Sequence, residues 1–306
     1  MIAPEWRAGN DCFIFWRQGG VDDAWGGLMR MSLIDRLFRR VLPPVALAEG
    51  PDLSDAGAMS LAEVSVCTGW TAGRLAQAEA LWGEGCVWPG GAEEFKRLAA
   101  PLELSPAHSL IVLGDGAAGA ARVLAADLGA WVSAYESDKV LHDAAEDWRK
   151  RGGAALAKRA TVAVWDKARA VFPARGFHHA MLLDGLSSTS GAPEQTALVL
   201  SGLARAVKAG GQIVVVQTVE GPEDDAAIVV ALEQAGCDVR VVEDESARHA
   251  RLVLHAWKLL LRRLRESRPT PAEAAALVQE AAIWLIRLRG VREGRIRVMR
   301  WGAIVG

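Results

Sequence analysis

The pattern of apolar and polar positions changes near residue 105. Upstream, apolar residues recur at helical spacing, whereas downstream short runs rich in β-branched residues alternate with alanine-rich helical stretches. These patterns predict strands at 109–113, 131–135, 161–164, 180–183, 213–219, 239–243 and 295–305, with helices at 117–128, 139–152 and 194–207. Alternation of this kind predicts an α/β fold with a mostly parallel sheet covered on both faces.

Two helical regions flank this alternation. The first runs from residue 60 to 101, and glycine and proline interrupt it at 83–85 and 89–91. The second, from Ala247 to Leu288, is predicted as a helical insertion before the final strand. The chain therefore divides into an N-terminal extension (1–50), part of which we expect to be disordered, a helical lead-in (51–104), a strand–helix core (105–245), and the insertion with the final strand (246–306).

Composition narrows the class of partner. The 306 residues are 51% hydrophobic and 24% charged, which suffices for a full α/β core with accessory segments. A formal net charge of -2 produces no strong positive field, so we do not expect nucleic acid as a partner. A small molecule or a protein fits better, and the oligomeric state stays open.

Cysteine usage and hydropathy suggest a compartment. The four cysteines are far apart and form no CxxC pair, so they indicate reduced thiols and no metal site. No apolar run reaches the length of about 18 residues that a membrane-spanning helix needs. We expect a cytoplasmic protein, and abundant alanine and arginine suggest a bacterial source. Residues 30–45 predict an amphipathic helix that either packs normally or docks on a membrane surface or a protein.

A glycine-rich segment carries the strongest chemical signal. Gly114, Asp115, Gly116 and Gly119 follow a predicted strand and open a helix, where backbone N–H groups can approach a nucleotide-type ligand. Glu136 stands 20 residues beyond Gly116, at the tip of the next strand, where a carboxylate can accept hydrogen bonds from both ribose hydroxyls.

A second carboxylate follows the third predicted strand. Asp166 can accept a hydrogen bond from an adenine amino group, and Trp165 offers an apolar surface to the ring. The same features would suit a nicotinamide oxidoreductase, and Tyr135 with Lys139 matches the YxxxK of short-chain dehydrogenases. However, this pair falls at the tip of the second strand, where the cofactor ribose is expected, whereas the dehydrogenase pair lies on a later helix beside the substrate.

Two further features resemble class I S-adenosylmethionine-dependent methyltransferases. The segment 208–211, Lys-Ala-Gly-Gly, is similar to the Lys-Pro-Gly-Gly turn before their fifth strand, and a helix followed by 295–305 resembles their antiparallel last strand. The resemblance implies a Rossmann-like sheet with a helical insertion before the last strand. It also implies S-adenosylmethionine as the cofactor.

Within that superfamily the lead-in resembles phosphoethanolamine methyltransferases and their small-molecule relatives. Trp70-Thr71-Ala72-Gly73, followed by Trp82-Gly83-Glu84 and Gly90-Gly91, matches their lead-in element in order and spacing. The resemblance implies that Val87 and Trp88 line the methionine end of the cofactor. It also implies contacts from Glu136, from Trp165 with Asp166, and from Asp184 to ribose, adenine and the opening of the site respectively.

The departures from this family concern its chemistry. Its catalytic tyrosine falls at Trp70, its histidine at Ser188, and its acidic residue before the glycine loop at Val112. An indole only donates, and a lone serine is a poor base, so neither replaces the lost pair. The remaining candidates for a proton acceptor are His178, His179, Asp184 and Glu84.

Two functions follow from this pattern. The first is methyl transfer to a small-molecule acceptor by in-line displacement, in which positioning of the acceptor dominates catalysis. The alternative is a catalytically inactive methyltransferase-like scaffold or regulatory binding protein, which the missing pair would explain. The sequence does not identify the acceptor.

Overall fold

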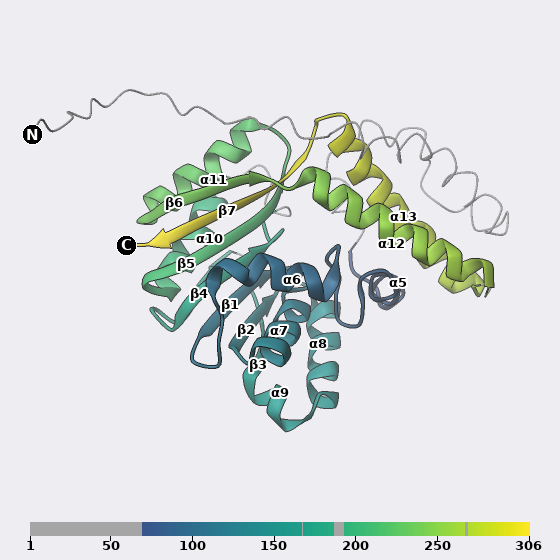
Figure 1. Cartoon of the computed structure of the whole chain (residues 1–306), viewed down its shortest axis with the longest axis horizontal. Helices are drawn as coiled ribbons and strands as arrows, with labels where there is room; N and C mark the ends of the chain where they lie inside the picture. Colours follow the sequence, from purple (N-terminus) through teal and green to yellow (C-terminus); the bar gives the residue numbers. More distant parts are fainter. Residues whose placement is uncertain (1–68, 167, 187–192, 267–268) are drawn as a thin grey trace, which may run out of the picture.

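A mixed sheet lies at the centre of the molecule (Figure 1). The computed structural model describes residues 69–166, 168–186, 193–266 and 269–306. The strands are β1 (Ser109–Gly114), β2 (Trp131–Glu136), β3 (Ala160–Val164), β4 (Phe177–Leu183), β5 (Val207–Val219), β6 (Cys237–Asp244) and β7 (Arg297–Val305). Their order is β3-β2-β1-β4-β5-β7-β6, and β7 runs antiparallel to both of its neighbours. The predicted α/β sheet with an antiparallel last strand is confirmed.

Helices cover both faces of the sheet. One face carries α10 (Pro193–Ala206) and α11 (Pro222–Gln234), whose leucine, valine and isoleucine side chains join the second core cluster. The other face carries the larger core cluster, to which the remaining long helices contribute. These helices are α5 (Ala72–Trp82), α6 (Gly91–Ala99), α7 (Ala117–Leu128), α8 (Lys139–Arg151), α12 (Ser246–Glu266) and α13 (Pro271–Arg292).

The shorter elements differ most from expectation. The predicted helix 139–152 ends at Arg151, and a separate α9 (Gly153–Arg159) begins at Gly153, whose φ of 82° breaks the helix. Strand β5 begins earlier than predicted because Val207 already pairs with Phe177. The register then shifts, so that Lys208–Gly211 forms a bulge before Gln212 pairs with His179.

The insertion begins and ends as helix chemistry predicts. Thr270 caps α13 by accepting a hydrogen bond from the backbone N–H of Glu273, and Glu273 reaches back to the backbone N–H of Thr270. Pro271 occupies the first turn, where its missing N–H costs nothing. Figure 1 shows α12 and α13 as a helical pair that projects beyond the sheet, with α5 packed against it.

Several sequence predictions lie outside the described residues. They include the N-terminal extension, the amphipathic helix at 30–45, and Ser188. Within the part that is described, no helix is both long and apolar enough to cross a membrane.

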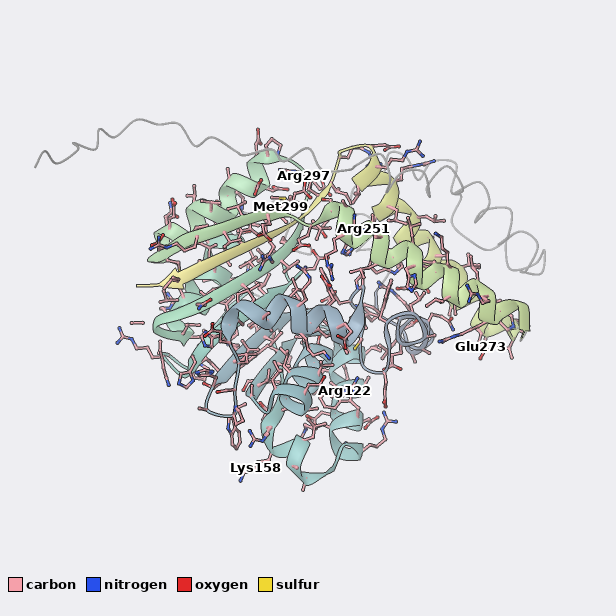
Figure 2. The ribbon with its side chains drawn as sticks, in the orientation of Figure 1. Arg122, Lys158, Arg251, Glu273, Arg297 and Met299 are labelled. Atoms are coloured by element: carbon pink, nitrogen blue, oxygen red, sulfur yellow. The ribbon has the colours of Figure 1, made fainter. Side chains whose placement is uncertain are left out.

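A network of ion pairs ties the lead-in to the insertion. Glu94 on α6 is 5% exposed and accepts hydrogen bonds from Arg97 at 2.7 Å and from Arg248 on α12 at 2.6 Å. Arg97 also donates to Glu245 at 2.8 Å, and Glu245 lies 3.5 Å from Arg300 on β7. Burial alone would raise the pKa of Glu94, but the two guanidinium groups outweigh it and hold this pKa below its usual range. A separate ion pair joins the same strand, β7, to α11. Arg297, which is labelled with Met299 in Figure 2, donates to Asp225 at 3.1 Å.

We expect Glu94→Gln to destabilise the fold by about 1–3 kcal/mol, because it removes the charge that Arg97 and Arg248 share. Urea unfolding of the full chain measures the change. Glu93→Gln is the matched control, since Glu93 is 84% exposed in its pair with Lys96 and is expected to change stability by less than about 0.5 kcal/mol. Equal losses in the two variants would contradict the assigned role of Glu94.

Candidate active site

The glycine loop joins β1 to α7 and lies directly against the lead-in. Gly116 has a φ of 80°, and a Cβ placed on it would lie 2.1 Å from Cγ2 of Val87. A Cβ on Gly119 would lie 2.0 Å from the carbonyl oxygen of Gly85. Both positions therefore require glycine. On the α7 side, Arg122 (labelled in Figure 2) donates a hydrogen bond to the carbonyl oxygen of Glu84.

Glu136 reaches the same loop from the end of β2. Its carboxylate accepts hydrogen bonds from the backbone N–H groups of Gly116 at 3.1 Å and Ala118 at 2.8 Å. The residue is 1% exposed, and burial raises its pKa to about 8 although the two backbone donors oppose the shift. The sequence placed Glu136 at a strand tip near the glycine loop, and it does lie there.

Asp115 connects the loop to the beginning of the described chain. Its carboxylate oxygens lie 3.5 Å from the indole Nε1 of Trp70 and 3.5 Å from Oγ of Ser137. The guanidinium of Arg74 lies over the Trp70 ring, 3.8 Å from its centroid, and donates to Glu280 on α13 at 2.9 Å. Trp70 is therefore held between the glycine loop and the insertion.

Asp184 follows β4 and joins the sheet to α13. Its φ is 50°, and its Oδ1 accepts hydrogen bonds from the Thr218 backbone at 2.9 Å and from Gln217 at 3.0 Å. Arg287 on α13 donates to Oδ2 at 2.9 Å. Burial alone would raise the pKa of Asp184, but Arg287 and Thr218 outweigh it and lower this pKa. Asp184 is thus a charged carboxylate whose two oxygens already accept hydrogen bonds, which makes it a poor proton acceptor.

Val87 and Trp88 lie where the lead-in crosses the site. Val87 contacts the glycine loop, and Trp88 is 5% exposed. The Trp88 ring meets the imidazole of His249 edge to face, with centroids 5.5 Å apart. His249 was not among the residues that the sequence singled out, because nothing in its local helical pattern distinguishes it from a packing residue.

The two residues predicted to contact adenine differ in their exposure. Trp165 is 4% exposed, and its ring packs against Gly185 within the second core cluster, so it leaves little surface for a ligand. Asp166 is exposed and pairs with Arg169 at 3.4 Å. Of the two residues, only Asp166 has an exposed side chain, and its contact with adenine stays a prediction.

Two of the candidate proton acceptors, His178 and His179, need correction, whereas Glu84 stays a prediction. His178 and His179 lie at the start of β4, and His179 pairs with Leu110 near the start of β1. The glycine loop lies at the opposite ends of these parallel strands, so neither histidine is near the site opening. The carboxylate of Glu84 is 65% exposed and lies 3.9 Å from Arg151, so it faces solvent.

The structure also separates Tyr135 and Lys139, the pair on which the dehydrogenase alternative rested. Tyr135 packs edge to face on Phe172 with centroids 5.1 Å apart, while Lys139 pairs with Asp143 in solvent. The two side chains therefore have separate partners and form no catalytic pair. Among the described residues, no cluster of histidine, cysteine and carboxylate side chains could hold a metal ion.

Comparison with known proteins identifies the fold. No protein-family model and no curated protein matches the chain. Phosphoethanolamine N-methyltransferase 2 of Haemonchus contortus matches with a TM-score of 0.66 and 17% identity over 81% of this chain and 61% of that chain. A putative sarcosine dimethylglycine methyltransferase from Galdieria sulphuraria matches with a TM-score of 0.59 and 14% identity over 77% of this chain and 99% of that chain.

A third likeness is to geranyl diphosphate C-methyltransferase of Streptomyces coelicolor, with a TM-score of 0.53 and 14% identity over 70% of this chain and 77% of that chain. This chain spans about three fifths of the length of the Haemonchus protein. The strand order and these likenesses together show that the chain has the fold of class I methyltransferases.

The raised pKa of Glu136 predicts a pH-dependent stability. In the unfolded chain this glutamate titrates near 4.5 and in the folded chain near 8, so ionisation opposes folding increasingly as pH rises between these values. We expect Glu136→Gln to gain stability relative to the wild type between pH 5 and pH 8, by up to about 1.4 kcal/mol per pH unit. Urea unfolding at several pH values measures this difference.

The substitution itself adds a cost that does not depend on pH, so only the change in the stability difference from one pH to the next reports the titration of Glu136. Glu79→Gln is a useful control because Glu79 also accepts a backbone hydrogen bond, from Gly85 at 2.9 Å, but is only partly buried. A difference between Glu136→Gln and the wild type that does not change with pH would show that Glu136 titrates normally.

Proposed function

We propose that this chain is an S-adenosylmethionine-dependent methyltransferase that acts on a small-molecule acceptor by in-line displacement. One observation carries the proposal: a fully buried carboxylate, Glu136, lies against the glycine loop at the carboxyl ends of the parallel strands. Ligands of open α/β sheets bind at that edge. A carboxylate buried there without a cation is costly unless a ligand completes its hydrogen bonds.

The residues present fit the proposed cofactor. A carboxylate offers about four acceptor positions, and two backbone N–H groups take two of those on Glu136. Two ribose hydroxyls would donate to the others and lower the pKa that burial raises. Asp166 would reach the adenine amino group, while Val87 and Trp88 would line the methionine end. When bound, the cofactor supplies an activated methyl group on a sulfonium, which is a good leaving group.

Known structures of similar fold support this assignment. The Haemonchus enzyme was determined with S-adenosyl-L-methionine and with S-adenosylhomocysteine, and the Streptomyces enzyme with S-adenosylhomocysteine. The two structures also contain small molecules, phosphomonomethylethanolamine in the first and geranyl diphosphate in the second. In this chain the lead-in and the insertion would enclose an acceptor of comparable class beside the glycine loop.

Isothermal titration tests the cofactor. We expect both S-adenosylmethionine and S-adenosylhomocysteine to bind the full chain, and Glu136→Ala to weaken S-adenosylhomocysteine roughly 10–100-fold, because charge-assisted hydrogen bonds to the ribose are lost. Asp147→Ala is the control, since Asp147 is an exposed carboxylate on α8 and its removal should leave affinity unchanged. Absence of binding to the wild type at millimolar ligand would overturn the proposed function.

A further inference from the structure

A cluster of imidazoles lies at the edge of the sheet opposite the glycine loop, where the parallel strands begin. His178 and His179 lie near the start of β4, and His108 directly precedes β1. Between ring centroids, His108 lies 5.4 Å from His178 and 5.3 Å from His179. Lys208, in the bulge of β5, reaches the same cluster, and its Nζ lies 2.9 Å from Nε2 of His178. The proposed methyl transfer uses none of these four side chains.

The backbone fixes which nitrogen of His178 carries the hydrogen. The backbone N–H of Ser109 donates to its Nδ1 at 3.0 Å. Because Nδ1 accepts, the other nitrogen of the neutral ring, Nε2, must carry the hydrogen. His179 is fixed in the same way, since the backbone N–H of Gln212 donates to its Nδ1 at 3.3 Å. Both rings therefore have an Nε2–H donor.

This tautomer makes the contact between His178 and Lys208 a meeting of two donors. An ammonium has three N–H groups and no lone pair, so it cannot accept a hydrogen bond from Nε2–H. Protonation of the ring does not relieve the contact, because burial and the positive charge of Lys208 both lower the pKa of His178. Two donors that face each other at 2.9 Å are stabilised by an acceptor that both can share.

The described residues do not supply a carboxylate as that acceptor. None of their aspartates or glutamates pairs with the four side chains, and the charges that act on the rings of His178 and His179 come from Lys208 and from the other imidazoles. The bulge is also held close to β4, because a Cβ on Gly211 would lie 2.2 Å from the His178 carbonyl oxygen. Lys208 itself is exposed, so its ammonium can shift to admit a ligand oxygen from solvent.

The neighbouring strand adds positive charge to this edge. Trp131 on β2 pairs in register with Ser109 on β1. Lys158, which is labelled in Figure 2, and Arg159 lie over the Trp131 ring, 5.9 Å and 5.0 Å from its centroid. These two cations do not contact His178, but they strengthen the potential that attracts an anion to the edge where the strands begin.

We propose that the phosphoryl group of a second ligand binds at this edge, with one oxygen accepting hydrogen bonds from Nε2 of His178 and from the ammonium of Lys208. A phosphoryl group carries nearly two negative charges at neutral pH and offers three acceptor oxygens. Hydrogen bonds to a charged acceptor are about twice as strong as neutral ones. A soluble phosphomonoester and a lipid headgroup share this chemistry. The ligand is distinct from the cofactor and the methyl acceptor, which belong to the opposite edge.

Inorganic phosphate is the probe for this site. ³¹P NMR line broadening on the full chain, with chloride added to keep the ionic strength constant, gives its dissociation constant. We expect saturable binding in the millimolar range and expect Lys208→Gln to weaken it about 10-fold, because one charge-assisted hydrogen bond is lost. Lys258→Gln is the matched control, since it removes the same charge from an exposed lysine on α12 and should leave the affinity unchanged.

The histidine ring signals locate the bound phosphate. In the chain labelled with [¹⁵N]histidine, ¹H–¹⁵N spectra show the tautomer of each ring. We expect His178 in the Nε2–H form and expect phosphate to shift its Nε2 signal, while exposed His255 on α12 stays unchanged. His178→Asn keeps an acceptor for the Ser109 N–H but removes Nε2–H, so it should also weaken phosphate. Urea unfolding confirms that each variant is folded, and exposed Lys208 gives the decisive variant if His178→Asn does not fold.

Three results would each overturn the proposed site: equal phosphate affinities of the wild type and Lys208→Gln, a His178 signal that phosphate does not shift, or an Nδ1–H tautomer of His178. If phosphate binds as expected, sedimentation with phosphatidylcholine vesicles that contain phosphatidic acid distinguishes the two sources. Co-sedimentation that depends on Lys208 assigns the phosphoryl group to a lipid headgroup, and its absence assigns the group to a soluble phosphomonoester.

Discussion

Two loops of this protein lie so close together that neither contact has room for a Cβ atom. Gly116 meets the side chain of Val87, and Gly119 meets the carbonyl oxygen of Gly85. Glycine within or beside a helix costs about 0.5–1 kcal/mol relative to alanine, so close approach must compensate for that cost. Because of this contact the lead-in forms one wall of the candidate site. Trp88, the residue after Val87, therefore lies against the insertion, where its ring contacts His249.

The insertion reaches the same place through a different interaction. Asp184 adopts a left-handed backbone conformation, which costs of order 1–3 kcal/mol for a residue other than glycine. That conformation lets one carboxylate accept hydrogen bonds from β5 and from Arg287 at once. The guanidinium of Arg287 also lies 5.4 Å from the Trp284 ring centroid. The end of β4 thereby fixes α13, and α13 helps fix His249 on α12.

The sequence predicted the positions of those residues of the candidate site whose placement depends on local pattern. A strand, a glycine turn and a helix are adjacent in the chain, so Gly114 to Gly119 could be placed, and Glu136 followed from the length of one helix and one strand. Burial of a side chain depends on tertiary packing instead. The pattern around Trp165 is the same whether its ring faces a ligand or Gly185, and only the fold shows the latter.

Long-range packing also explains the two largest errors in the search for a base. His178 and His179 precede the apolar part of β4, and in a parallel strand residues that precede the run lie at the edge opposite the ligand. The position of His249 depends on long-range packing in the same way. Its helix docks on the lead-in through contacts between segments far apart in the chain, which no local periodicity records.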